Sequence, residues 1–389
     1  MKIAYVTPRY GVEVVGGAEA GARGLAEHLV SDLGWDVEAL TTCAVDNRTW
    51  TDEYEEGTTD LNGVRVHRFR SERGRDPGFD RFSRTVMQLP HRAAPRDQVR
   101  WIELQGPHNP RLLEAIRDTD ADLVVFTPYL YEPTALGLPT VGRRAVFHPA
   151  AHEEQPIHLP LFRRVFGSAR GIAFYTFKER RLVERLFPVA STPQIVLGLG
   201  VDESSGDADS ARAAVGVGDR PFLHYQGRVD DGKGTTVLAE FFAAYKRRRP
   251  GPLALVLAGP VVDTPPAHPD ILLPGMVDES IMHGLFRAST VYVHPSAYES
   301  FSITLMDAWE GGRPVLVNGR CDVTREHCLR SEGGLWFDSY AAFEVVLDRL
   351  LADAELRDRL GAAGKAYVDA HYRWPTLLER YRVFLESLA

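Results

Sequence analysis

Two cations lie close together in residues 227–234, GRVDDGKG. The β-rich run at residues 222–226 predicts a strand that ends at this point, and a helix is expected just beyond it. We therefore expect Arg228 and Lys233 in a turn at the carboxyl end of a strand, where both can point at one anion. A guanidinium and an ammonium suit a diphosphate and would stabilise it as a leaving group. The alternative is that both are solvated loop cations.

Two acids follow in residues 296–318, SAYESFSITLMDAWEGGRPVLVN. Glu299 and Asp307 are eight positions apart, so on one helix their side chains would share a face. Glu299 is expected where this helix begins, beside the free amides of residues 301–303, and such amides bind phosphate readily. Asp307 would then accept hydrogen bonds from a vicinal diol such as a ribose. The alternative is that both acids are ordinary surface residues of the helix, with Glu299 a favourable charge in its first turn.

The elements that must position these residues alternate between short β-rich runs and helical periods. Strands are expected at residues 2–7, 37–42, 123–127, 145–147, 171–175, 222–226, 254–258, 291–293 and 315–318, and helices at residues 18–33, 235–247, 279–287 and 303–310. This alternation predicts parallel sheets covered on both faces. Residues 198–219, rich in Gly, Ser and Asp, interrupt it and predict a domain boundary. Two sheets in sequence leave a cleft at their strand ends, where open α/β sheets bind ligands.

Composition narrows the class of protein. The 389 residues suit two domains, and 44% hydrophobic with 25% charged residues is typical of a globular chain. The net charge of −8 gives no support for a nucleic-acid partner. Neither a secretory signal nor an apolar run of about 20 residues is present, so we expect a cytoplasmic protein. Cys321, His327 and Cys328 lack a second ligand pair at metal-binding spacing, so we expect no metal site.

These motifs, in this order, resemble the family 4 retaining glycosyltransferases. The family has a Glu-x7-Glu motif after a Pro-Ser pair, as here after Pro295 and Ser296, and a Gly-Arg turn followed by Lys-Gly. The similarity extends over nearly the whole chain and includes the loops at residues 16–19, 198–202 and 275–277. It implies the GT-B architecture: two Rossmann-like domains (residues 1–198 and 199–372), a deep interdomain cleft, and a C-terminal helix (373–389) that crosses back to the N-domain.

The resemblance also implies roles for single residues. Glu299 would contact hydroxyls of the donor sugar, and Asp307 the ribose. The other expected donor contacts are the diphosphate cations Arg228 and Lys233, the N-domain glycines Gly16 and Gly17, the base-contacting loop at Met276 and Val277, and the amides of Phe301, Ser302 and Ile303. Two departures are visible, because Asp307 replaces a Glu, and Ser300 and Ser302 replace glycines. Neither change removes the expected site.

The family also places a histidine at the cleft, near the reacting carbon of the donor and often followed by an acid. Three histidines follow the expected strand at residues 145–147: His148, His152 and His158. His152, followed by Glu153, fits this role best, and His148 is the rival. The alternative is that all three are surface loop histidines.

The resulting functional prediction is a retaining, metal-independent hexosyltransferase. It would move a sugar from a UDP- or GDP-linked donor to a hydroxyl of a glycan, lipid-linked or small-molecule acceptor, with no cofactor and with the two cations in place of a metal. The alternative is a catalytically degenerate GT-B protein that serves as a nucleotide-sugar binding or partner subunit, an option suggested by Asp307.

Residues 65–100 are rich in arginine, with apolar residues interleaved. The arginines are Arg65, Arg68, Arg70, Arg73, Arg75, Arg81, Arg84, Arg92, Arg96 and Arg100. In an acidic chain this asymmetry favours a surface for an anionic or lipid-linked acceptor, with peripheral attachment at the inner face of the membrane. The alternative is a solvated, partly mobile loop.

Overall fold

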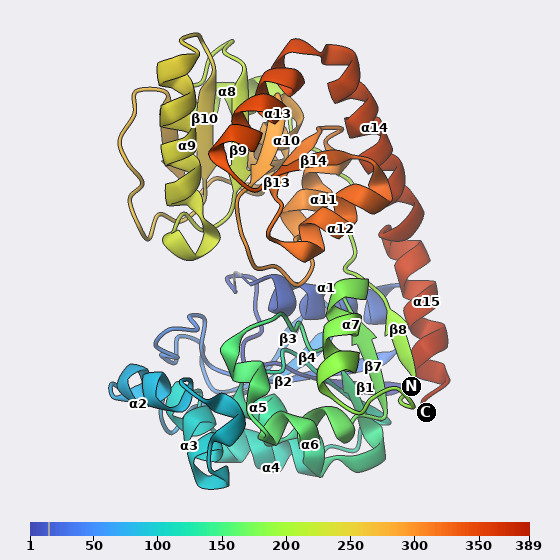
Figure 1. Ribbon diagram of the computed structural model, residues 1–389. Coiled ribbons are helices and arrows are strands. Elements are labelled where there is room, and N and C mark those ends of the chain that lie inside the picture. The colour runs from blue at the N-terminus through green and yellow to red at the C-terminus, as the bar shows by residue number, and fades with distance from the viewer. Residues whose placement is uncertain (15) are drawn as a thin grey trace. The chain divides into compact units, whose positions relative to one another are not determined.

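The computed structural model describes residues 1–14 and 16–389. The described residues divide into two compact units. Unit 1 is formed by Met1–Gly200 together with Trp374–Ala389, and unit 2 by Val201–Arg373. Each unit has its own β-sheet with helices packed on both faces (Figure 1).

The sheet of unit 1 has the strand order β3-β4-β2-β1-β5-β6-β7-β8. Its strands are β1 (Lys2–Val6), β2 (Asp36–Thr42), β3 (Gly57–Leu61), β4 (Val64–Phe69), β5 (Leu123–Phe126), β6 (Ala145–Phe147), β7 (Gly171–Phe174) and β8 (Gln194–Val196). Neighbouring strands are parallel, except that the edge strand β3 pairs antiparallel with β4. The carboxyl ends of the parallel strands therefore share one edge of the sheet.

Helices connect these strands and cover the sheet. They are α1 (Gly17–Ser31), α2 (Phe79–Val86), α3 (Pro95–Gln105), α4 (Pro110–Asp118), α5 (Glu132–Ala135), α6 (Leu161–Gly167), α7 (Phe177–Leu186) and α15 (Trp374–Glu386). Short 3-10 turns are η1 (Pro90–Arg92), η2 (Leu138–Thr140), η3 (Gly142–Arg144) and η4 (Gln155–His158).

The sequence of β1 is almost entirely apolar because both of its faces are buried. Ile3 and Tyr5 belong to one core cluster, together with buried residues of α1 and α15. Ala4 and Val6 belong to the other, together with buried residues of α3, α4 and α6. Because both faces of a parallel sheet are covered, successive residues are all buried and the strand does not alternate with polar residues.

The C-terminal helix α15 packs onto unit 1, as the family resemblance implies. Leu377, Leu378 and Leu385 are at most 3% exposed and belong to the same cluster as α1. At the centre of this packing the hydroxyl of Tyr5 donates to the hydroxyl of Tyr381 at 3.1 Å. The last helix of the chain is therefore part of the core of unit 1.

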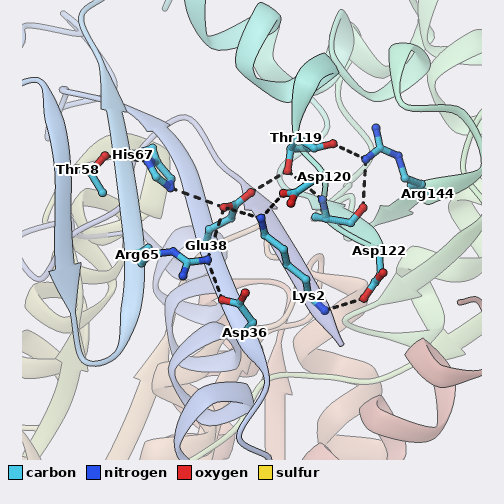
Figure 2. Close-up of polar contacts among 11 residues, drawn as sticks. Lys2, Asp36, Glu38, Thr58, Arg65, His67, Thr119, Asp120, Asp122 and Arg144 are labelled. Carbon is cyan, nitrogen blue, oxygen red and sulfur yellow. Dashed lines mark hydrogen bonds and ion pairs between the residues drawn. The ribbon is translucent and has the colours of Figure 1, made fainter.

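A polar network lies at the amino-terminal edge of the unit 1 sheet (Figure 2). The Lys2 ammonium is 3.6 Å from the Glu38 carboxylate, which also accepts a hydrogen bond from Thr119 Oγ1 at 2.7 Å. Arg65 pairs with Asp36 at 2.8 Å across neighbouring strands. Open parallel sheets bind ligands at the opposite, carboxyl edge. We therefore interpret this network as structural.

Unit 2 has a fully parallel sheet with the strand order β11-β10-β9-β12-β13-β14. Its strands are β9 (Phe222–Gln226), β10 (Ala254–Ala258), β11 (Ile271–Gly275), β12 (Val291–His294), β13 (Val315–Asn318) and β14 (Gly334–Phe337). Its helices are α8 (Ala208–Val215), α9 (Thr235–Arg248), α10 (Glu279–Ala288), α11 (Ile303–Glu310), α12 (Asp322–Ser331), α13 (Tyr340–Ala352) and α14 (Ala354–His371), with the 3-10 turn η5 (Asp231–Lys233).

The helices of unit 2 also cover both faces. Leu223 and Tyr225 of β9 cluster with buried residues of α9 and α13, whereas Phe222 clusters with α8 and α10. Both units are thus Rossmann-like α/β bodies, as the sequence predicts.

The structure corrects two expectations about local structure. The two units divide after Gly200, inside residues 198–219, but this stretch also contains α8, which was not expected and whose N-cap Asp207 accepts a hydrogen bond from the amide of Ser210 at 2.7 Å. Residues 65–100 are not a mobile loop, because they contain the end of β4, helix α2 and the start of α3. Here Val64 and Val66 alternate with exposed Arg65, the pattern of a half-buried strand.

Candidate functional site

The predicted cation turn follows β9 and is held by Asp230. Its buried carboxylate accepts a hydrogen bond from the amide of Lys233 at 2.7 Å and also pairs with the guanidinium of Arg228. Gly234 closes the turn with φ 76°, and a Cβ there would lie 2.8 Å from the carbonyl oxygen of Pro295. Only glycine meets both conditions, so this turn is locked against the loop after β12.

Neither predicted cation is free in this structure. Arg228 is paired with Asp230, and Lys233 Nζ lies 2.7 Å from Glu299 Oε1. Both side chains still keep part of their surface exposed, 44% for Arg228 and 33% for Lys233. An incoming anion can therefore reach both cations from solvent.

Glu299 is the residue on which the site converges. Besides Lys233, its Oε1 lies 3.2 Å from Nε2 of His294, the last residue of β12. Burial by itself would raise the pKa of Glu299, but the hydrogen bond from His294 and the charge of Lys233 outweigh it and hold this pKa well below its usual range. The carboxylate is therefore ionised and accepts hydrogen bonds.

The helix after Glu299 begins later than the sequence suggests. Helix α11 starts at Ile303, so Glu299 precedes it instead of sharing a helix face with Asp307, which corrects that expectation. Ser302 is the N-cap and has a left-handed backbone with φ 72°. Within residues 1–14 and 16–389, the amides of Phe301, Ser302 and Ile303 donate no hydrogen bond. Unpaired N–H groups at a helix N-terminus are able to bind an anion.

Asp307 lies on α11, half-buried, in acidic surroundings. Burial and the nearby carboxylates of Asp202, Glu310 and Glu279 raise the pKa of Asp307 to about 8. Such a site favours a ligand that donates hydrogen bonds to the carboxylate, as a vicinal diol does.

The loop after β11 carries the expected base contacts. Gly275 ends the strand with φ 75°, and the following Met276 is 70% exposed. Val277 instead packs against the core cluster of α8 and α10. The methionine thus offers apolar surface, whereas Val277 anchors the loop.

In unit 1 the two predicted glycines begin α1. Gly16 is the N-cap and Gly17 the first helical residue. A Cβ on Gly16 would lie 2.5 Å from Glu19 Oε2 and 2.9 Å from Arg9 Nη2, the partners of a buried ion pair. Among the described residues, a Cβ on Gly17 would have no neighbour within 4 Å. Gly16 is therefore required by packing, whereas the surface above Gly17 is open.

The histidines after β6 differ in their surroundings. His148 is 2% exposed, and its Nε2 lies 2.9 Å from the Tyr381 hydroxyl, so it is a residue of the core. Its burial also lowers its pKa to about 3. The side chain of His152 is 35% exposed and its Nε2 lies 3.5 Å from Glu154. Glu153, the acid named from the sequence, pairs instead with His158 at 2.7 Å.

The arginine-rich region is a folded surface with a groove. A cavity of about 750 Å³ lies along α3 and is lined by Arg73, Asp76, Pro95, Arg96, Val99, Arg100, Glu103 and Leu104. Several arginines are partnered: Arg75 with Asp80 at 2.9 Å, and Arg100 over the ring of Phe82 at 5.1 Å. None of the helices in the described part of the chain has the length and apolarity that a membrane span needs.

Sequence reasoning missed His294 and Asp230 as parts of the site. A signal for His294 existed, because it is a polar residue at the end of an apolar strand, at the edge where parallel sheets bind ligands. Asp230 lies between the two predicted cations, and its capping role follows from its position before the 3-10 turn.

Comparison with known proteins places this geometry in context. Residues 207–367 match the family model of glycosyl transferases group 1. An uncharacterized glycosyltransferase of Methanocaldococcus jannaschii is 22% identical over the full length of both chains. The GDP-mannose-dependent alpha-(1-6)-phosphatidylinositol monomannoside mannosyltransferase of Mycobacterium tuberculosis is 24% identical, covering 62% of this chain and 68% of its own.

Solved structures share the fold. Sucrose-phosphate synthase from Thermosynechococcus elongatus superposes with a TM-score of 0.73 at 17% identity, covering 100% of this chain and 98% of its own. The HepE protein of Anabaena, in complex with UDP and glucose, gives a TM-score of 0.69 at 14% identity, covering 100% of both chains. Residues 207–367 therefore belong to the glycosyl transferases group 1 family, and the chain has the GT-B fold of these solved structures.

Proposed function

We propose that this protein is a retaining, metal-independent hexosyltransferase that moves a sugar from a UDP- or GDP-linked donor to an acceptor hydroxyl. The observation that supports this most is the ion pair between Lys233 and Glu299 at 2.7 Å, just before the unpaired amides of residues 301–303. One place in unit 2 thus offers a cation for phosphate and a carboxylate for sugar hydroxyls.

In this proposal each residue has one task. Arg228, Lys233 and the α11 amides bind the diphosphate and stabilise the charge that develops when the bond to the sugar breaks. Glu299 accepts hydrogen bonds from the sugar, and Asp307 from the ribose. The departing phosphate takes the proton of the acceptor hydroxyl, and the acceptor attacks from the same face, so the anomeric configuration is retained.

The remaining donor contacts are proposed from the resemblance to the family. Gly16 and Gly17 let a backbone amide approach the diphosphate, and Met276 and Val277 of unit 2 contact the base. His152 is the proposed cleft histidine, because His148 is enclosed by the core.

The decisive experiment measures release of UDP or GDP from UDP-glucose and GDP-mannose, with EDTA present, across a panel of acceptor alcohols. We expect turnover in EDTA and a loss of about 100-fold in kcat for Lys233→Ala, because one stabilising donor to the leaving group is removed. Lys2→Ala is the matched control, since Lys2 is an ion-paired lysine at the amino edge of the other sheet. Donor binding without any turnover would instead support the degenerate-subunit alternative.

For the acceptor we propose an anionic or lipid-linked molecule that meets the arginine-rich surface at the inner face of the membrane. Arg73, Arg96 and Arg100 line the groove, and Leu89 nearby is 52% exposed. Flotation with vesicles that contain anionic lipid tests this. Binding that weakens with salt is expected, whereas equal recovery with neutral and anionic vesicles would contradict it.

A further inference from the structure

His294 has no task in the mechanism above, yet it touches the central carboxylate. It is 4% exposed at the end of β12, and its Nε2 lies 3.2 Å from Glu299 Oε1. We propose that His294 is a positioning residue that keeps Glu299 in its sugar-binding orientation when Lys233 turns to the donor diphosphate. This inference rests on the proposed function.

Lys233 has two anions to neutralise. In the structure its ammonium binds Glu299, but on donor binding the same group would also face phosphate. A buried carboxylate that loses its partner is costly and tends to reorient or take up a proton. His294 donates to the same oxygen, Oε1, from a strand that no ligand needs to displace. It therefore supplies the contact that is independent of the donor.

The imidazole of His294 is itself held from several directions. Its Nδ1 lies 3.2 Å from the Tyr292 hydroxyl, which donates to Thr304 Oγ1 of α11 at 2.8 Å. On the other side, Ser302 Oγ lies 3.5 Å from Nε2. These contacts connect β12 to the start of α11, so they fix Glu299 relative to the unpaired amides of residues 301–303.

The charged and titratable groups that face Glu299 are few among the described residues. Lys233 and His294 contact it, and Tyr225, Tyr292 and Cys321 lie close enough to interact electrostatically. With His294 removed, Lys233 is the remaining group that favours the ionised carboxylate. Loss of the histidine should therefore weaken recognition of the sugar, and raise the pH below which that recognition is lost, more than it weakens binding of the nucleotide.

The same sheet offers a matched control. His224 of β9 is 0% exposed, and within the described chain neither of its ring nitrogens has a hydrogen-bond partner. It resembles His294 in residue type, burial and strand context but does not contact Glu299. His224→Leu therefore reports what the loss of a buried histidine does to the sheet alone.

The experiment compares His294→Leu, His294→Gln and His224→Leu by calorimetric titration with UDP, UDP-glucose, GDP and GDP-mannose. The measured quantity is the affinity gained from the sugar, the ratio of the two dissociation constants for the base that wild type prefers. We expect His294→Leu to lower this ratio about tenfold, because one hydrogen bond to a charged group is lost. His294→Gln keeps an N–H donor and should recover to within about threefold, and His224→Leu should match wild type.

A second readout is pH. The same ratio of dissociation constants should start to fall at a higher pH in His294→Leu than in wild type, and at an unchanged pH in His224→Leu, because only the former removes a donor to the Glu299 carboxylate. The contribution of Asp307 to ribose binding cancels in this ratio. If His294→Leu does not fold, Tyr292→Phe takes its place, with an expected loss of about threefold.

Equal behaviour of His294→Leu and His224→Leu in both readouts would overturn the role of His294 and leave the proposed function standing. Equal behaviour of Tyr292→Phe and wild type would do the same if that variant is the one used. Wild-type protein that binds none of the four nucleotides would overturn the proposed function, and this inference with it.

Discussion

Donor affinity should depend on pH through Asp307. Burial and the carboxylates of Asp202, Glu310 and Glu279 raise its pKa to about 8 in the free protein. In the proposed function the ribose diol donates hydrogen bonds to this carboxylate, so the ligand binds the ionised form. Binding then lowers the pKa, and affinity rises with pH until the free protein is itself ionised.

The magnitude follows from the distance to that pKa. At pH 7, one unit below it, about a tenth of the protein carries an ionised Asp307, which costs about 1.4 kcal/mol of binding free energy relative to full ionisation. At pH 9 about nine tenths is ionised. The affinity for a nucleoside diphosphate should therefore rise roughly tenfold between pH 7 and pH 9 from this group.

Titration of wild type and Asp307→Asn with UDP and GDP at several pH values isolates this effect. The ligand and every other group titrate alike in both proteins, so only the ratio of their affinities reports Asp307. That ratio should increase with pH and level off above pH 8. A ratio that stays flat from pH 7 to pH 9 would refute the role of Asp307 in binding the ribose.

Three further predictions concern stability. Ser302→Gly relieves a left-handed residue with φ 72° and should stabilise the protein by about 1 kcal/mol in denaturant unfolding; an unchanged midpoint would argue against strain. Gly16→Ala should destabilise by about 1–3 kcal/mol because its methyl meets the Arg9–Glu19 ion pair, whereas Gly17→Ala should melt like wild type but bind donor more weakly; equal melting of the two variants would contradict this. Removal of residues 374–389 strips Leu377, Tyr381 and Leu385 from the core at about 1.5–3 kcal/mol each, so unit 1 should lose cooperative unfolding; an unchanged Tm would refute that.

The alternation of strands and helices was predictable because each element has its own local pattern of apolar residues. Residues 222–226 and 254–258 coincide with β9 and β10, and the family resemblance is confirmed together with the packing of the last helix. Elements with weaker patterns were missed. Helix α8 was hidden in a stretch rich in Gly, Ser and Asp, and β3 is an exposed edge strand without apolar alternation.

Chain order alone places cations after β9, an acid after β12 and glycines at the start of α1. Such positions follow from chain order, since each motif lies next to its own strand. Only the tertiary structure decided which of them meet. Lys233 and Glu299 are 66 residues apart and form an ion pair because β9 and β12 are neighbours in the sheet. The contact of His294 with Glu299 and the enclosure of His148 by Tyr381 from α15 also depend on packing that no local pattern encodes.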